Sequence, residues 1–246
     1  MFFSKFCMLF KHKKFFYTDL MKSHKEIKDL QTMQRRKLFI FPGLRCIMLK
    51  NRIWGVIRVD FTEKTIESET VYEGRIIKVR SDRVTLVNGD VSSREVVEHA
   101  GGVAVLPMFE DGTVLMVRQY RYPMERSLLE LPAGKLEKGE DPLQCAVREL
   151  SEETGCTAEE FVYLGEIYPS PGYCKEILYI YLARGLKNGK PHPDKDEFLS
   201  VEKYDIRELV EMIGRNELCD AKTVVGILKT MDYLGERYGQ NDTYRR

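Results

Sequence analysis

Three glutamates crowd one short stretch of this 246-residue chain. Glu149, Glu152 and Glu153 are spaced i, i+3 and i+4, so on a helix their carboxylates would project within reach of one another. Such a group could be a solvated acidic stripe, or it could hold a divalent cation. Two of the three would lie near a helix C-terminus, where the macrodipole disfavours anions by about 0.3 to 1 kcal/mol. A cation would offset that penalty, and oxygen ligands without His or Cys suit Mg²⁺ or Mn²⁺.

The flanking residues predict the helix that would present these carboxylates. Asp141 followed by Pro142 is typical of a helix start, because aspartate caps free backbone N–H groups and proline suits the first helical position. Gly155 predicts the stop, because glycine adopts the left-handed conformation at little cost. The apolar residues with helical spacing predict the buried face: Leu143, Ala146, Val147 and Leu150. The glutamates should then project away from that face.

Residues 134–156, GKLEKGEDPLQCAVRELSEETGC, resemble the Nudix box, a pattern that reads G-x5-E-x7-R-E-U-x-E-E-x-G-U with U a bulky apolar residue. The matching positions are Gly134, Glu140, Arg148, Glu149, Leu150, Glu152, Glu153, Gly155 and, as a small apolar stand-in, Cys156. The resemblance implies an α+β Nudix fold, in which helices sandwich a mixed β-sheet. It also implies hydrolysis of a nucleoside diphosphate linked to another moiety.

Ligand roles follow from the same resemblance. It implies that Glu149 and Glu153 are the principal metal ligands, with Glu152 as a further ligand or a carboxylate close behind them. The backbone carbonyl of Ala133 is implied to touch the metal as well. The implied cofactor is Mg²⁺, with Mn²⁺ possible. Arg148 would hold the carboxylates in position by charge-assisted hydrogen bonds.

Sequence outside the box resembles the ADP-ribose pyrophosphatase group. The similar stretches are RQYRYPMERSLLELPAGKLEKGE before the box and YPSPGYCKE after it. Members of this group have a proline about 15 residues beyond the box, and Pro171 lies 15 residues after Cys156. Arg94 and Arg121 match substrate-side arginines of the group. We therefore predict substrate binding by Arg94, Arg121 and Pro171.

A glutamate on a loop after the box serves as, or orients, the catalytic base in this group. Glu197, in the sequence DKDEF, is the matching position, although Asp194 and Asp196 are close enough to be alternatives. Glu152 and Arg148 complete the predicted catalytic set. Metal ions that bridge the pyrophosphate would neutralise its charge and help to deprotonate the attacking water.

The predicted reaction is Mg²⁺-dependent hydrolysis of ADP-ribose to AMP and ribose 5-phosphate. One alternative is a Nudix activity on another nucleotide sugar, such as GDP-mannose or ADP-glucose. Another is a non-catalytic sensor that binds ADP-ribose, which the full set of glutamates disfavours. The resemblance also implies a homodimer. We predict no nucleic-acid partner.

Charge and the pattern of residue types divide the chain into an extension, residues 1–60, and a body, residues 61–246. Residues 1–60 hold 14 Lys and Arg against 4 Asp and Glu, whereas residues 61–246 hold 25 against 34. Aromatic and basic residues alternate in the first segment, so a membrane-surface helix, a targeting peptide or a nucleic-acid arm stays open beside a disordered tail. We predict that residues 1–60 are disordered or outside the catalytic fold.

The sequence of the body predicts mainly strands and few helices. Asn88-Gly89 and Asp111-Gly112 each interrupt a strand-like run and predict hairpins. Aspartates at helix-start positions, Asp205 and Asp220, precede two later helices. We predict a Nudix domain over residues 61–240, with an antiparallel strand region at about 61–98 and a tail at 241–246.

The cysteines and the lengths of the apolar runs indicate in which cellular compartment the protein is expected. Six cysteines occur without a C-x-x-C pair, which favours reduced thiols over a zinc ribbon or a disulfide framework. No apolar run approaches the roughly 18 to 20 residues of a membrane span. The sequence therefore predicts a cytoplasmic protein without a membrane span.

Overall fold

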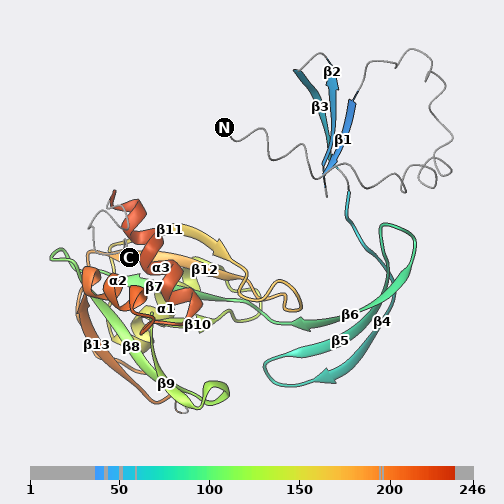
Figure 1. The fold of residues 1–246 in the computed structure, drawn as a ribbon. Coiled ribbons are helices and arrows are strands. Elements are labelled where there is room, and N and C mark those ends of the chain that lie inside the picture. The colour runs from blue at the N-terminus through green and yellow to red at the C-terminus, as the bar shows by residue number, and fades with distance from the viewer. Residues whose placement is uncertain are drawn as a thin grey trace. The chain divides into compact units, whose positions relative to one another are not determined.

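The computed structural model of the chain describes residues 37–41, 44–49, 52–58, 60–193, 195 and 197–235, and Figure 1 draws its helices and strands. The chain divides into two units, Met1–Thr62 and Glu63–Arg246. In the first unit three strands form an antiparallel sheet: β1 (Lys37–Phe41), β2 (Leu44–Leu49) and β3 (Arg52–Arg58). That residues 1–60 lie outside the catalytic fold stays a prediction. Residues 1–36 and the predicted tail at 241–246 lie outside the described residues.

The second unit begins with an antiparallel sheet in the order β4-β5-β6. Its strands are β4 (Lys64–Glu73), β5 (Lys78–Thr85) and β6 (Val91–Glu98). The hairpin predicted at Asn88-Gly89 is confirmed, because that turn joins β5 to β6 with Gly89 at φ = 90°. A glycine suits this position since side-chain-bearing residues rarely adopt such a φ.

A four-stranded mixed sheet forms the centre of the second unit, in the order β10-β7-β12-β11. Its strands are β7 (Gly102–Pro107), β10 (Ala133–Lys135), β11 (Glu160–Ile167) and β12 (Leu178–Arg184). The pair β7 and β12 is parallel, and the two outer pairs are antiparallel. Every residue of β7 is buried, as expected for a strand that is covered on both faces.

Another sheet has the order β13-β8-β9. Its strands are β8 (Thr113–Arg121), β9 (Arg126–Glu130) and β13 (Leu199–Asp205), and the short 3₁₀ helix η3 (Tyr122–Met124) joins β8 to β9. The hairpin predicted around Asp111-Gly112 exists only as a turn, with a single bridge between Met108 and Val114. The N–H of Phe109 also donates to the Thr113 carbonyl across the turn at 2.8 Å. Beyond it β7 and β8 enter different sheets, so the predicted turn is confirmed but the two strands pair only next to it. Pro107 has no N–H with which to extend the ladder.

Helices cover both faces of the mixed sheet, and they are labelled in Figure 1. They are α1 (Pro142–Thr154), α2 (Ile206–Gly214) and α3 (Ala221–Tyr233). Successive residues of β7 point to opposite faces, so Val105 joins a cluster with Leu150 of α1 while Leu106 joins a cluster with Ile227 of α3. The predicted α+β fold, with a mixed sheet between helices, is confirmed.

The later helices begin where their aspartates predict. Asp205 accepts a hydrogen bond from the N–H of Arg207 at 2.8 Å, and Asp220 accepts one from the N–H of Thr223 at 3.0 Å. Among the described residues, no helix has both the length and the apolar character that crossing a membrane requires.

Candidate active site

Helix α1 presents the glutamates, and both of its ends lie at the predicted residues. Asp141 accepts a hydrogen bond from the N–H of Leu143 at 2.9 Å, and Gly155 ends the helix at φ = 73°. The buried face of the helix differs from the prediction. Leu143 and Val147 are 38% and 42% exposed, whereas Glu149 and Glu153 are only 6% and 2% exposed. The expectation that the glutamates project away from the buried face was therefore wrong for these two.

Strand β10 explains why these two carboxylates turn inward. The backbone N–H of Ala133 donates to Glu153 Oε2 at 2.9 Å. The carboxylate of Glu149 lies directly against Gly134, where an added Cβ would stand 1.8 Å from the Glu149 Cδ atom. A donor on one residue and a missing side chain on the next thus create room for two buried carboxylates. Such an arrangement cannot be seen from the spacing of apolar residues within the helix.

Burial raises the pKa of both carboxyls. Loss of hydration raises the pKa of Glu149 to about 7 and that of Glu153 to about 8. The charge of Glu197 acts in the same direction on both groups. Arg148 opposes the rise for Glu149, and the Ala133 N–H opposes it for Glu153. A divalent cation would supply the positive charge that these buried oxygens lack, so the donors fit a hard cation such as Mg²⁺.

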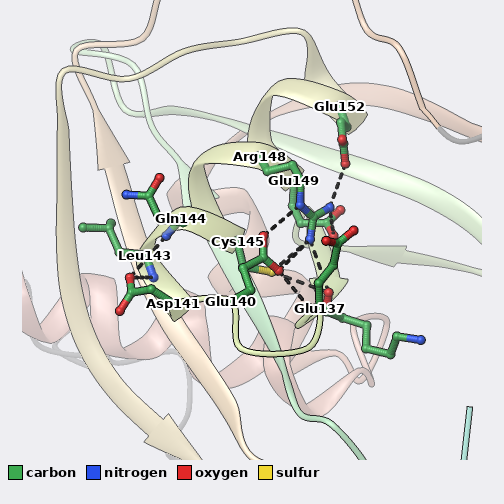
Figure 2. A network of polar contacts seen from close by, with 10 residues as sticks. Glu137, Glu140, Asp141, Leu143, Gln144, Cys145, Arg148, Glu149 and Glu152 are labelled. Carbon is green, nitrogen blue, oxygen red and sulfur yellow. Dashed lines mark hydrogen bonds and ion pairs between the residues drawn. The ribbon is translucent and has the colours of Figure 1, made fainter.

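Arg148 lies at the centre of an ion-pair network on α1 and the loop before it (Figure 2). Its Nε and Nη2 atoms donate to the two carboxylate oxygens of Glu140 at 2.9 and 3.1 Å. Its Nη1 atom donates to Glu149 Oε1 at 2.7 Å and to Glu152 Oε2 at 2.9 Å. The Arg148 hydrogen bonds lower the pKa of Glu140 to about 2. Arg148 therefore joins the loop to the glutamates of the helix.

The predicted metal ligands are only partly brought together. Glu149 and Glu153 meet at β10 beside Ala133, whereas Glu152 is paired with Arg148 and its side chain is 28% exposed. In residues 60–193, 195 and 197–235, no three His, Cys, Asp or Glu side chains converge as a ready metal site.

Glu197 lies just before β13 and is partly buried. Its charge acts on both Glu149 and Glu153, so the structure brings it near the two buried carboxylates. The two alternatives for the base, Asp194 and Asp196, lie outside the described residues. The assignment of Glu197 as the base stays a prediction.

A cavity of about 340 Å³ opens beside β10, with Ala133 and Gly134 in its wall. Arg121 lines the cavity too, but the other two predicted substrate-side residues do not. Arg94 lies on β6, where its Nη2 atom pairs with Glu63 at 2.5 Å. The proline that lines the cavity is Pro169, two residues before Pro171. The structure thus brings Arg121 alone of these three to the carboxylate site.

Two residues of the cavity region were missed at the level of sequence. Glu130, at the end of β9, is 1% exposed and accepts two hydrogen bonds from Arg121, each of 2.7 Å. Lys222 of α3 donates to the same carboxylate and lines the cavity. One signal was available, because Glu130 stands between two leucines, Leu129 and Leu131, that both become buried. Lys222 had no comparable signal.

Comparison with protein families identifies this arrangement. The family model described as NUDIX domain matches residues 98–224, just over half of the chain. The chain belongs to the Nudix hydrolase family. A second family model, described as the nucleoside diphosphate sugar hydrolase N-terminal domain, matches residues 63–97, which form β4 to β6.

The alignments of this chain with individual relatives span most of each relative's length. A methanol dehydrogenase activator of Bacillus methanolicus is 43% identical over 68% of this chain and 91% of its own. An ADP-ribose pyrophosphatase of Bacillus subtilis is 42% identical over 67% of this chain and 90% of its own. A crystal structure of an ADP compounds hydrolase aligns with a TM-score of 0.63, at 22% identity, over 70% of this chain and 94% of that chain. This last likeness supports the Nudix fold.

Proposed function

We propose that this Nudix hydrolase cleaves the pyrophosphate of ADP-ribose, with Mg²⁺ as cofactor, to give AMP and ribose 5-phosphate. The observation that carries the proposal is the pair of buried glutamates, Glu149 and Glu153, which lie against Ala133 and Gly134 in the wall of the cavity that Arg121 lines. The similarity to a protein named ADP-ribose pyrophosphatase, over 90% of its length, supports this substrate.

Three groups would hold the cofactor: the carboxylates of Glu149 and Glu153 and the carbonyl oxygen of Ala133. Glu152 would join them as a further ligand. Mn²⁺ would suit the same oxygens. When bound, the cation would neutralise charge on the pyrophosphate and lower the pKa of a bound water.

The other residues would orient the substrate and move the proton. Arg148 holds Glu149 through a 2.7 Å hydrogen bond and would keep that carboxylate in place against Gly134. Arg121 would bind a phosphate oxygen, since a guanidinium matches the geometry of phosphate. Glu197 would accept the proton of the attacking water, because its charge already reaches both buried glutamates.

A panel of nucleotide sugars tests this function. The purified chain is incubated with Mg²⁺ and each of ADP-ribose, GDP-mannose and ADP-glucose, and phosphate is measured after phosphatase treatment. ADP-ribose should be turned over fastest, and little turnover should remain when EDTA replaces Mg²⁺. Faster turnover of GDP-mannose would overturn the choice of substrate. Binding of ADP-ribose without turnover would show a sensor instead of an enzyme.

We further infer a homodimer that forms through the sheet of β4 to β6. All ten residues of β4 are exposed, and among the described strands β4 pairs with β5 alone. Its apolar side chains include Ile66, Val71 and Tyr72, each more than half exposed. An edge strand of this length with apolar side chains is a site for pairing with another chain. Sedimentation at micromolar concentration should give twice the 28.7 kDa chain mass, and a monomer mass would refute the inference.

A cytoplasmic location is the last part of this proposal. Its support is the set of cysteines, since the four in residues 60–193, 195 and 197–235 are all free and an oxidising compartment would favour pairing. Fractionation of cells should place the protein with cytoplasmic markers, and its recovery with membranes would contradict this.

A further inference from the structure

Glu130 is the most buried ionised group beside the cavity. Although burial acts to raise its pKa, the hydrogen bonds from Arg121 and the charge of Lys222 bring that pKa below its ordinary value. A carboxylate buried in this way contributes little net stability, because its loss of hydration cancels much of the gain from its partners. Its place in the molecule therefore suggests another reason for the ion pairs.

The two cations that Glu130 holds both line the cavity. Glu130 accepts hydrogen bonds from the Nε and Nη2 atoms of Arg121 and thereby fixes the plane of the guanidinium. In the described part of the chain, the Nη1 atom of Arg121 has no hydrogen-bond partner. Lys222 likewise donates two of its three N–H groups, to Glu130 and to Asp220, and the third has no partner among the residues that the structure describes. Each cation can thus offer donors to a ligand in the cavity.

Hydrogen bonds of α3 tie Lys222 to the strand that carries Glu130. Asp220 caps α3 and accepts from the Thr223 hydroxyl at 2.6 Å. The same hydroxyl accepts from the backbone N–H of Leu131, the residue after Glu130, at 2.9 Å. The first turn of α3 and the end of β9 are therefore joined through backbone as well as side chains. Leu131 is two residues before Ala133, so these hydrogen bonds also lie close to the part of the cavity wall that Ala133 and Gly134 form.

We propose that Glu130 is a positioning residue, which holds Arg121 and Lys222 side by side so that their remaining N–H groups bind phosphate oxygens of the substrate. The inference rests on the proposed function, because it assumes that a pyrophosphate lies between the buried glutamates and the cavity. With Asp220, which also pairs with Lys222, the cluster holds two cations and two carboxylates. An anion would therefore be bound by the N–H groups that Arg121 and Lys222 have left over and not by a net positive charge. Fixing the guanidinium in advance lowers the entropic cost of ligand binding.

A double-mutant cycle tests whether Glu130 acts through Arg121. Glu130→Gln keeps the shape of the side chain and removes its charge. It should raise KM for ADP-ribose by roughly tenfold, the effect of losing a hydrogen bond to a charged group, with a smaller change in kcat. Arg121→Ala should raise KM at least as much. The double variant should be no worse than the worse single variant, whereas multiplying effects or an unchanged KM in Glu130→Gln would overturn the proposal.

A similar ion pair on β8, the strand that carries Arg121, provides a control. Arg118 of β8 forms a similar two-point pair with Glu202 of β13, with distances of 2.6 and 3.0 Å, and neither residue lines the cavity. Glu202→Gln should leave KM unchanged. An equal rise in KM for this control would show that any lost ion pair has the effect, and would overturn the positioning role.

Two further measurements complete the test. Lys222→Met should also raise KM, and an unchanged KM would remove Lys222 from the proposal. If Glu130→Gln does not fold by thermal melting, Arg121→Lys replaces it. A lysine keeps the charge but loses the two-point attachment, so KM should still rise, and wild-type KM would refute the need for attachment.

Binding of ADP-ribose in EDTA, measured by calorimetry, separates this inference from the proposed function. Weaker binding by Glu130→Gln than by wild type supports the positioning role even if ADP-ribose is not hydrolysed. If another nucleotide sugar is the substrate, the proposed function fails, and the same cycle run with that compound decides the role of Glu130.

Discussion

Replacement of Glu153 by glutamine should change how the stability of the metal-free protein depends on pH. Burial raises the pKa of this carboxyl from 4.5 to about 8. Below pH 4.5 the group is protonated in the folded and the unfolded chain and costs nothing. Between about pH 4.5 and 8 the unfolded chain loses the proton and the folded chain keeps it, so the free energy of unfolding falls as pH rises. Above pH 8 the cost is constant.

The size of this effect follows from the two pKa values. Each pH unit in that window costs about 1.4 kcal/mol, so the wild type should lose roughly 3 kcal/mol between pH 5 and pH 8 through Glu153 alone. Glu153→Gln removes this titration. Glu149, whose pKa is raised to about 7, continues to titrate in both proteins. The difference between the two proteins therefore reports the titration of Glu153 together with its coupling to Glu149, whose charge raises the pKa of Glu153.

Urea unfolding in EDTA at pH 5, 6, 7 and 8 measures the difference. The stability of Glu153→Gln should fall by about 3 kcal/mol less than that of the wild type over this range. Glu137→Gln, at an exposed glutamate on the loop before α1, should follow the wild type. Parallel curves for the wild type and Glu153→Gln would refute the buried-carboxylate reasoning. With Mg²⁺ added, turnover by Glu153→Gln should be lower by orders of magnitude, and near-normal activity would remove Glu153 from the metal site.

Three further outcomes are expected. Gly134→Ala places a Cβ 1.8 Å from the Glu149 carboxyl carbon, so calorimetry should show weaker Mg²⁺ binding while circular dichroism stays like that of the wild type; unchanged binding would contradict this. Arg148 lowers the pKa of Glu140 to about 2, so this pair should stabilise the fold above pH 4.5 and lose its effect as pH falls toward 2. Glu140→Gln should be less sensitive to acid unfolding, and an equal acid midpoint would count against it. Deletion of residues 1–60 should leave kcat/KM largely intact, and failure of the shortened chain to fold would show that the segment belongs to the domain.

Local signals predicted the helix and the family well. Asp141 and Gly155 mark the ends of α1 because capping depends on residues that are neighbours in sequence. The same holds for the hairpin at Asn88-Gly89, whose conformation is set within the turn. The spacing of the glutamates and their flanking residues was sufficient to indicate the Nudix box, because the box is one continuous stretch.

The tertiary structure alone decided which side chains are buried and which meet. The burial of Glu149 and Glu153 depends on strand β10, which supplies the Ala133 donor and the open space at Gly134. No periodicity within α1 reports on that strand. The apolar pattern therefore placed Leu143 inside and the glutamates outside, in contrast to the structure.

Contacts between distant segments were equally beyond the sequence. Glu130 and Lys222 are 92 residues apart, yet they share one ion-pair network with Arg121. Arg94 and Arg121 looked alike as substrate-side arginines, but only Arg121 lines the cavity. Sequence by itself determined the chemistry of the box and the ends of its helix, because both are local. The cavity, its cations and the raised pKa of the Glu149 and Glu153 carboxyls required the fold, because burial and long-range pairing exist only once strands and helices have packed.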